Sequence, residues 1–197
     1  AQGDLVTTPD SGIGYVAGVS YEMPEIALKV LLTQAPGIDI VVPTTVVGSG
    51  TVSQPSFTTL EFETGIANNT LMFGSIHQGE HASAQVKLNG IGAISSFTDG
   101  EKYNIGVGRK FSEKLSGSFS YTTEEGSSAT GTSLLSPTNG TDTYSIGVNY
   151  VTESVDVAFG YAMSSFGDKA VTTAYGTGNF TNNDATTTGL RVKFKLP

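Results

Sequence analysis

Large apolar side chains alternate with small polar ones along residues 103–121, which read YNIGVGRKFSEKLSGSFSY. The large residues are Tyr103, Ile105, Val107, Leu115, Phe119 and Tyr121, and the alternate positions of each arm hold glycine, serine and asparagine. A period of two is typical of a β-strand, because successive side chains point to opposite faces. Since Ser112, Glu113 and Lys114 interrupt the alternation, the stretch predicts a hairpin of two strands.

The two faces of this predicted hairpin differ in side-chain size. A soluble sheet buries its large residues under a second layer, and its other face is polar. Here the second face carries side chains too small to pack an inner layer, which suits a barrel whose aromatic face meets lipid. The pattern therefore predicts a membrane-embedded barrel. The alternative is a soluble β-sandwich binding module, which would bury the Tyr, Phe and Val face.

The same alternation recurs along the chain and predicts nine strands in total. They are expected at about 15–22, 26–32, 60–63, from 71 onward, 103–108, 115–121, 144–150, 155–163 and 190–196. The β-branched run IDIVV at 38–42 is expected to extend the second strand before a long loop. The fold class expected is therefore all-β, an antiparallel up-and-down transmembrane β-barrel with about nine or ten strands.

Short and long connections alternate between the predicted strands. Tight turns fall near residues 24, 68, 113 and 153, and the other connections are long, polar and rich in glycine. Bacterial outer-membrane barrels have this layout, with short periplasmic turns and long extracellular loops. Nine antiparallel strands would close with two parallel neighbours, so we expect the sequence to be part of a larger barrel.

The composition narrows the classes of function. Of 197 residues only 14% are charged, the net charge is -8, and cysteine is absent. A nucleic-acid partner is disfavoured because phosphate binding needs clustered Lys and Arg, and disulfides and thiolate metal sites are excluded. No apolar run reaches the roughly 20 residues of a membrane-spanning helix. No secretory signal begins the sequence, which we interpret as a mature form or a fragment.

Strand parity places five charged residues on the inward face: Lys29, Glu61, Glu63, Arg191 and Lys193. We take these five as the candidate ligand-binding residues, because their side chains would face the lumen of the barrel. Glu61 and Glu63 could pair as acid and base, but no serine is marked as a nucleophile with a positioned base. We therefore favour a lumen charge network, and predict no catalytic residue, no enzymatic activity and no cofactor.

The segment from His77 to His81 matches the inverted zincin pattern H-x-x-E-H. That pattern needs a helix, where residues four apart share a face and both imidazoles can reach one ion. Here the segment follows a predicted strand, in which the two histidines would lie roughly 13 Å apart at about 3.3 Å per residue. We expect an exposed rim segment and no metal site. Arg109 and Lys110, beside a turn, are expected to anchor at the membrane interface.

Four segments resemble a known family: GYVAGVSYEMPEIALKVLLT, FTTLEFETGIANNTLMFGSI, YNIGVGRKFSEKLSGSFSY and SPTNGTDTYSIGVNY. Together they are similar to the C-terminal half of the FadL family of outer-membrane transport proteins, particularly its alphaproteobacterial forms. The resemblance implies a bacterial outer-membrane location and a fourteen-stranded barrel plugged by an N-terminal hatch. It also implies passive transport of long-chain fatty acids or other hydrophobic small molecules, with the lipid bilayer as surroundings.

Three features depart from the family's pattern. The hatch and the early strands have no counterpart, tryptophan is absent, and the sequence closes with KFKLP instead of a terminal aromatic residue. We therefore expect residues 1–197 to be a single β-barrel domain, the C-terminal portion of a longer barrel lacking the hatch. The alternative function is a structural or adhesive outer-membrane barrel with interaction loops and no transport.

Overall fold

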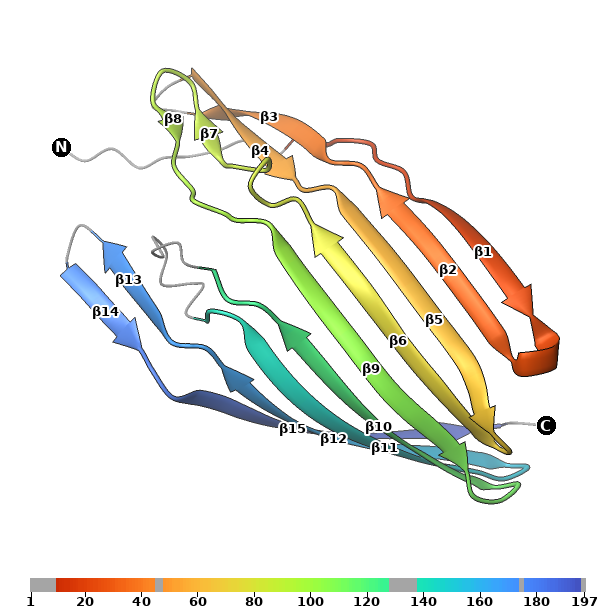
Figure 1. Cartoon of the computed structure of the whole chain (residues 1–197). Helices are drawn as coiled ribbons and strands as arrows, with labels where there is room; N and C mark the ends of the chain where they lie inside the picture. Colours follow the sequence, from red (N-terminus) through yellow and green to blue (C-terminus); the bar gives the residue numbers. More distant parts are fainter. Residues whose placement is uncertain (1–9, 45–47, 128–137, 174–175, 196–197) are drawn as a thin grey trace.

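The computed structural model describes residues 10–44, 48–127, 138–173 and 176–195. Nine long strands form one antiparallel sheet (Figure 1). The strands lie in the order β1-β2-β5-β6-β9-β10-β11-β12-β15. Their bounds are Ala17–Met23 (β1), Leu28–Ala35 (β2), Phe57–Ala67 (β5), Thr70–Gly79 (β6), Gly100–Lys110 (β9), Leu115–Glu124 (β10), Thr141–Val151 (β11), Val155–Phe166 (β12) and Asn183–Phe194 (β15). Each of the nine predicted strands is confirmed within the described residues, which leave the predicted end of the last strand at Leu196 outside them, and strands that follow one another among these nine are neighbours in the sheet.

The sheet curves into an open trough whose edges are β1 and β15 (Figure 1). No pairing joins β1 to β15 within the described residues. Because nine strands alternate in direction, both edge strands run toward the end where the short turns lie. The expected fold class is confirmed as an all-β, antiparallel, partial barrel. No described helix has the length and hydropathy needed to cross a membrane.

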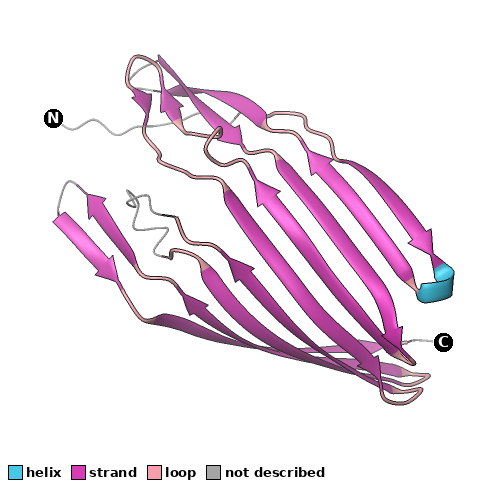
Figure 2. Ribbon diagram, viewed as in Figure 1, coloured by secondary structure: helices cyan, strands magenta, loops and turns pink. Residues whose placement is uncertain are grey.

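Six shorter strands occupy the long connections, which the sequence had suggested to be irregular (Figure 2). One small sheet consists of β3 (Ile38–Thr44), β4 (Gly48–Gln54), β7 (Lys87–Leu88) and β8 (Gly92–Ala93), and a hairpin consists of β13 (Lys169–Thr173) and β14 (Gly176–Phe180). The expectation that 38–42 extends the second strand was wrong. Pro36 and Gly37 follow the end of β2, and β3 pairs with β4 instead.

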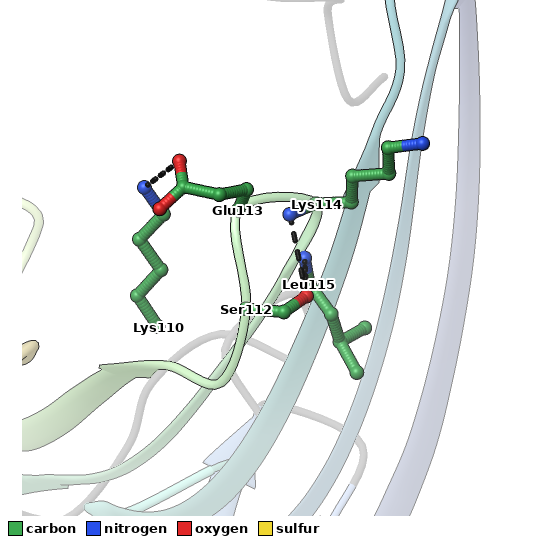
Figure 3. Close-up of polar contacts among 5 residues, drawn as sticks. All are labelled: Lys110, Ser112, Glu113, Lys114 and Leu115. Carbon is green, nitrogen blue, oxygen red and sulfur yellow. Dashed lines mark hydrogen bonds and ion pairs between the residues drawn. The ribbon is translucent and has the colours of Figure 1, made fainter.

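All four predicted tight turns are confirmed. The first is a 3-10 turn, η1 (Pro24–Ile26), so Ile26 lies outside the strand expected to contain it. Ala27 and Asn69 adopt left-handed conformations with φ of 50° and 56°. In the third turn the Ser112 hydroxyl accepts hydrogen bonds from the backbone N–H groups of Lys114 and Leu115, at 3.3 and 3.1 Å (Figure 3).

The fourth turn is closed by Thr152 and Val155. The N–H of Thr152 donates to the carbonyl oxygen of Val155 at 2.7 Å, and the N–H of Val155 donates to the Thr152 hydroxyl at 2.9 Å. The Thr152 side chain thus accepts a hydrogen bond from a backbone N–H group within the turn itself. Short polar turns therefore gather at one end of the sheet, which we call the turn end, and the long connections lie at the other, the loop end.

Strand register sorts the sheet into two faces of different character. Ile146 lies opposite Phe119 and Tyr161, and most of the large apolar residues of the nine strands share this outer face, with Phe57, Leu71 and Phe73 among the exceptions on the inner face. Ser145 lies opposite Ser120 and Ala162 on the inner face, which lines the trough. The large residues stay uncovered: Ile146 is 50% exposed and Leu190 is 70% exposed.

The nine-stranded sheet has no packed core among the described residues. Among the described residues the buried apolar side chains are Ala84 and Val171, and both belong to the long connections. A soluble β-sandwich would have covered the aromatic face with a second layer, and no such layer is present in the described chain. The sandwich alternative is therefore wrong. The apolar outer face is the arrangement that a sheet in lipid requires.

One inner-face contact fixes the spacing of two strands. The ring of Phe73 on β6 lies over Gly106 on β9, its register partner. A Cβ atom at Gly106 would stand 2.4 Å from Phe73 Cζ and 2.8 Å from the carbonyl oxygen of Phe119. Only glycine leaves room for the aromatic ring here, as in other glycine-aromatic pairs across strands.

We predict that Gly106→Ala lowers the free energy of unfolding by about 1–3 kcal/mol, because the added methyl overpacks the Phe73 contact. The matched control is Gly160→Ala, since a Cβ at Gly160 meets no atom within 4 Å. Urea titration of both variants folded in detergent micelles would measure the change. Equal effects from the two substitutions would contradict the packing seen at Gly106.

Candidate functional site

Described residues of the inner face line hollows along the trough, and three of them are considered below. A hollow of about 410 Å³ lies at β2, β5 and β6, which we call the side hollow. A hollow of about 650 Å³ lies toward the turns of β9 to β12, the turn-end hollow. A third, of about 480 Å³, lies beneath the long connections, the loop-end hollow. We compare the sequence-derived candidates with these three places.

Lys29, Glu61 and Glu63 all line the side hollow. Lys29 lies opposite Glu63 in the β2–β5 register, and its ammonium is 3.4 Å from a carboxylate oxygen of Glu22 on β1. Both partners of that ion pair are about half exposed, so solvent screens it strongly. This part of the inner face carries three carboxylates, of Glu22, Glu61 and Glu63, and one ammonium, of Lys29, so it is acidic.

Arg191 and Lys193 lie on β15, at the opposite edge of the sheet. The guanidinium of Arg191 is 4.0 Å from a carboxylate oxygen of Asp156, which lies opposite Lys193 in the β12–β15 register. The Arg191 side chain is 69% exposed, and the residue lines the turn-end hollow. Two cations face one carboxylate, so this edge of the inner face is basic.

The structure thus separates the five predicted residues into two groups of opposite charge. Strands β6, β9, β10 and β11 lie between the acidic group on β2 and β5 and the basic group on β12 and β15. Strand parity identified the face of each residue, because parity needs only the local alternation. It could not give the distance between groups, which depends on how many strands intervene and how the sheet curves.

The floor of the turn-end hollow is made of very small residues. Gly108 on β9, Gly147 on β11 and Ala158 on β12 line it together with Leu71 and Arg191. No acidic side chain lines this hollow. A surface of backbone and methyl groups, with Arg109, Lys110 and Arg191 among its lining residues, can hold an apolar body and an anionic group.

Two residues of the side hollow did not emerge from the sequence pattern. Phe73 and Asn104 both line it, and they lie on the inner face of β6 and β9. The Asn104 amide donates to the Thr122 hydroxyl at 2.7 Å and to the Tyr121 carbonyl at 3.3 Å. Met72 lies opposite Val107, which is on the outer face, so the next residue, Phe73, lies on the inner face. The weak alternation of β6 hid this signal.

The two histidines pack around one phenylalanine at the loop end. The Phe57 ring stacks on His77, with centroids 5.2 Å apart, and meets His81 edge-on at 5.6 Å. The His77 Nδ1 atom and the Thr59 hydroxyl form a hydrogen bond of 2.7 Å. Within the described ranges, no three side chains of His, Cys, Asp or Glu are grouped to hold a metal ion. The H-x-x-E-H segment therefore has an aromatic packing role here.

The loop-end hollow is polar and carries charges of both signs. His77, His81, Asp99, Lys102 and Glu124 are among its lining residues. The Asp99 carboxylate accepts a hydrogen bond from the N–H of Ala82 at 2.8 Å, which ties the long connection to itself. The loop-end hollow thus differs from the turn-end hollow, whose lining residues are mostly small and apolar.

Neither a family model nor a curated protein matches the sequence. Among solved structures, the chain is similar to a FadL homologue from Pseudomonas aeruginosa, with a TM-score of 0.66 and 11% identity over 91% of this chain. It is also similar to the CymD monoaromatic hydrocarbon channel, with a TM-score of 0.58 and 12% identity over 92% of this chain.

The chain spans about half of each of these two proteins, 50% of the first and 51% of the second. At such low identity the likeness concerns the fold. It agrees with the order, direction and curvature of the nine strands described above. The chain therefore has the fold of part of a FadL-type barrel, as the resemblance of its strand segments had indicated.

Proposed function

We propose that this chain is part of a bacterial outer-membrane barrel through which hydrophobic small molecules diffuse passively, long-chain fatty acids being the first class to test. The observation that carries the proposal is the hollow inner face behind an apolar outer face. The turn-end hollow of about 650 Å³ lies in the range of sites that hold small-molecule ligands. The two similar solved structures are described as a FadL homologue and a hydrocarbon channel, which supports the same reading.

The mechanism we propose needs no covalent chemistry. An apolar chain would rest on the glycine and alanine floor of the turn-end hollow, where Gly147 and Ala158 leave space. A carboxylate at its end would meet Arg191, and Lys193 would add to the positive field. Lys29, Glu61 and Glu63 would keep anionic groups away from the other edge, because their net charge is negative. Movement between such shallow sites would then be diffusion along the trough.

The first prediction concerns which face meets lipid. Ile146 is the central residue of β11 on the outer face, and Ser145 precedes it on the inner face. Ile146→Arg is expected to reduce the free energy of folding into lipid vesicles by about 2–4 kcal/mol, the cost of an arginine at the bilayer midplane. Ser145→Arg is expected to cost little, since its guanidinium remains in the wet interior. Guanidinium titration in vesicles measures both.

A reversed order, with Ser145→Arg the more costly variant, would overturn the lipid-facing assignment. Equal and small costs would mean that neither face lies in hydrocarbon. Isoleucine has a higher strand propensity than serine, but that scale spans only about 1 kcal/mol, which is less than the expected difference of about 2–4 kcal/mol.

The second prediction uses the absence of tryptophan from the chain. Ala158→Trp places one fluorophore at the turn-end hollow, and Val157→Trp places it on the outer face beside Tyr150. Brominated oleate should quench Ala158→Trp saturably, with reversal by unbrominated oleate. Brominated phospholipid should quench Val157→Trp instead. Fluorescence titration of each full-length variant in lipid vesicles provides the measurement.

Quenching of Ala158→Trp that rises linearly, without saturation or competition, would mean that oleate only partitions into the membrane. That result would argue against a site in the trough. Quenching of both variants by brominated phospholipid would show that lipid fills the inner face.

The third prediction concerns the charged residues. Arg191→Gln should weaken binding of oleate by up to about fivefold, since an exposed ion pair is worth at most about 1 kcal/mol. It should leave binding of oleyl alcohol unchanged, because the alcohol carries no charge. The control is Lys29→Gln, whose ammonium already lies 3.4 Å from Glu22 and faces Glu63. Displacement of a fluorescent fatty acid measures each affinity, and an equal loss for acid and alcohol would exclude a headgroup role.

A further inference from the structure

The outer face carries a cluster of cationic and aromatic side chains at its turn end, in the hairpin of β9 and β10 and on the adjoining β11. We call this cluster the turn-end patch, and it comprises Arg109, Phe111, Lys114, Leu115 and Tyr150. Arg109 lies opposite Thr70 and Gly117, and Gly117 lies opposite the outer-face residue Val148. Arg109 therefore belongs to the same face as the apolar belt.

The charges of the hairpin turn are divided between its two sides. The ammonium of Lys110, on the inner face, is 3.0 Å from a carboxylate oxygen of Glu113 (Figure 3). Lys114 extends to the other side of the turn, away from that pair. Within the described residues neither Arg109 nor Lys114 has an ion-pair partner. Glu113 is thus matched with Lys110, while Arg109 on the outer face and Lys114 on the far side of the turn remain.

Exposed apolar side chains lie beside these two cations. Phe111 is 63% exposed, and its ring covers Gly117, where a Cβ would stand 3.0 Å from Phe111 Cε2. Leu115 lies opposite Tyr150, which is 46% exposed. Aromatic rings and long cationic side chains at the end of an apolar belt are the arrangement that suits the headgroup level of a bilayer.

The outer face has the opposite charge at its loop end. Asp142 and Asp184 lie there in one register row, and Glu101 accepts a hydrogen bond from Gln78 at 2.7 Å. The other acidic residues at the turn end of β9 to β12 are Glu153, in the next turn, and Asp156, on the inner face. An anionic headgroup is therefore favoured at the turn end and repelled at the loop end.

We propose that the turn-end patch binds the headgroup of an anionic phospholipid. The phosphate would lie between Arg109 and Lys114, and the acyl chains would run along Phe111, Leu115 and Tyr150. A lipid is the occupant favoured here because the patch is continuous with the belt of apolar residues on the same strands. This inference rests on the proposed function, which places the outer face in a bilayer.

The test compares lipid binding by the full chain in nonionic micelles, using native mass spectrometry with phosphatidylglycerol and phosphatidylcholine. The wild-type chain is expected to prefer phosphatidylglycerol. The double variant Arg109→Gln/Lys114→Gln should lose about fivefold in affinity for each cation removed, and should bind the two lipids alike. The control, Lys87→Gln/Lys102→Gln, has the same net charge and should keep the preference, because both lysines lie away from the patch.

Equal binding of the two lipids by the wild-type chain would overturn the inference, since two available cations should favour the anionic headgroup. Equal losses in the two double variants would also overturn it, since net charge alone would then explain the preference. Folding of the chain into vesicles and saturable quenching of Ala158→Trp are separate readouts. If these succeed while the lipid preference is absent, the proposed function stands and only the lipid site falls.

Discussion

The backbone hydrogen bonds between neighbouring strands are the constraint on which the rest of this structure depends. A sheet one layer thick has no second layer to bury its apolar side chains, and in hydrocarbon every unpaired N–H or C=O group costs several kcal/mol. From β2 to β12 each strand of the sheet is paired on both sides. In the proposed membrane setting, this pairing would let the exposed side chains of Ile146 and Phe159 face hydrocarbon with no unpaired backbone group beside them on the sheet.

The glycines and small residues of the inner face follow from the same constraint. Because the sheet curves toward the inner face, side chains there converge, and large ones would fill the trough. Phe73 is accommodated only where Gly106 lies opposite it. Gly147 and Ala158, by contrast, leave the turn-end hollow open. Small side chains thus serve curvature and free interior space together, and this link connects the fold to the proposed passage of hydrophobic molecules.

Charge is distributed in two directions on this sheet. Across the trough, the acidic group around Lys29, Glu61 and Glu63 opposes the basic group of Arg191 and Lys193. Along the outer face, carboxylates lie toward the loops, and Arg109, which has no ion-pair partner among the described residues, lies toward the turns. Because only 14% of the residues are charged, few neighbouring charges weaken the electrostatic field of each of these groups. The first asymmetry lies across the inner face, and the second lies along the outer face between its loop end and its turn end.

The sequence by itself determined the nine strands, their turns and the face of the residues in strongly alternating strands, since alternation and turn chemistry are local properties; in β6, where alternation is weak, it did not reveal that Phe73 faces inward. Tertiary structure alone decided the partners. Ile38 to Thr44 has strong strand propensity, yet it pairs with β4 after a Pro-Gly break, and Lys29 meets Glu22 while Arg191 meets Asp156. Which groups share a hollow depends on strand order and sheet curvature, and these arise from contacts between residues far apart in the chain.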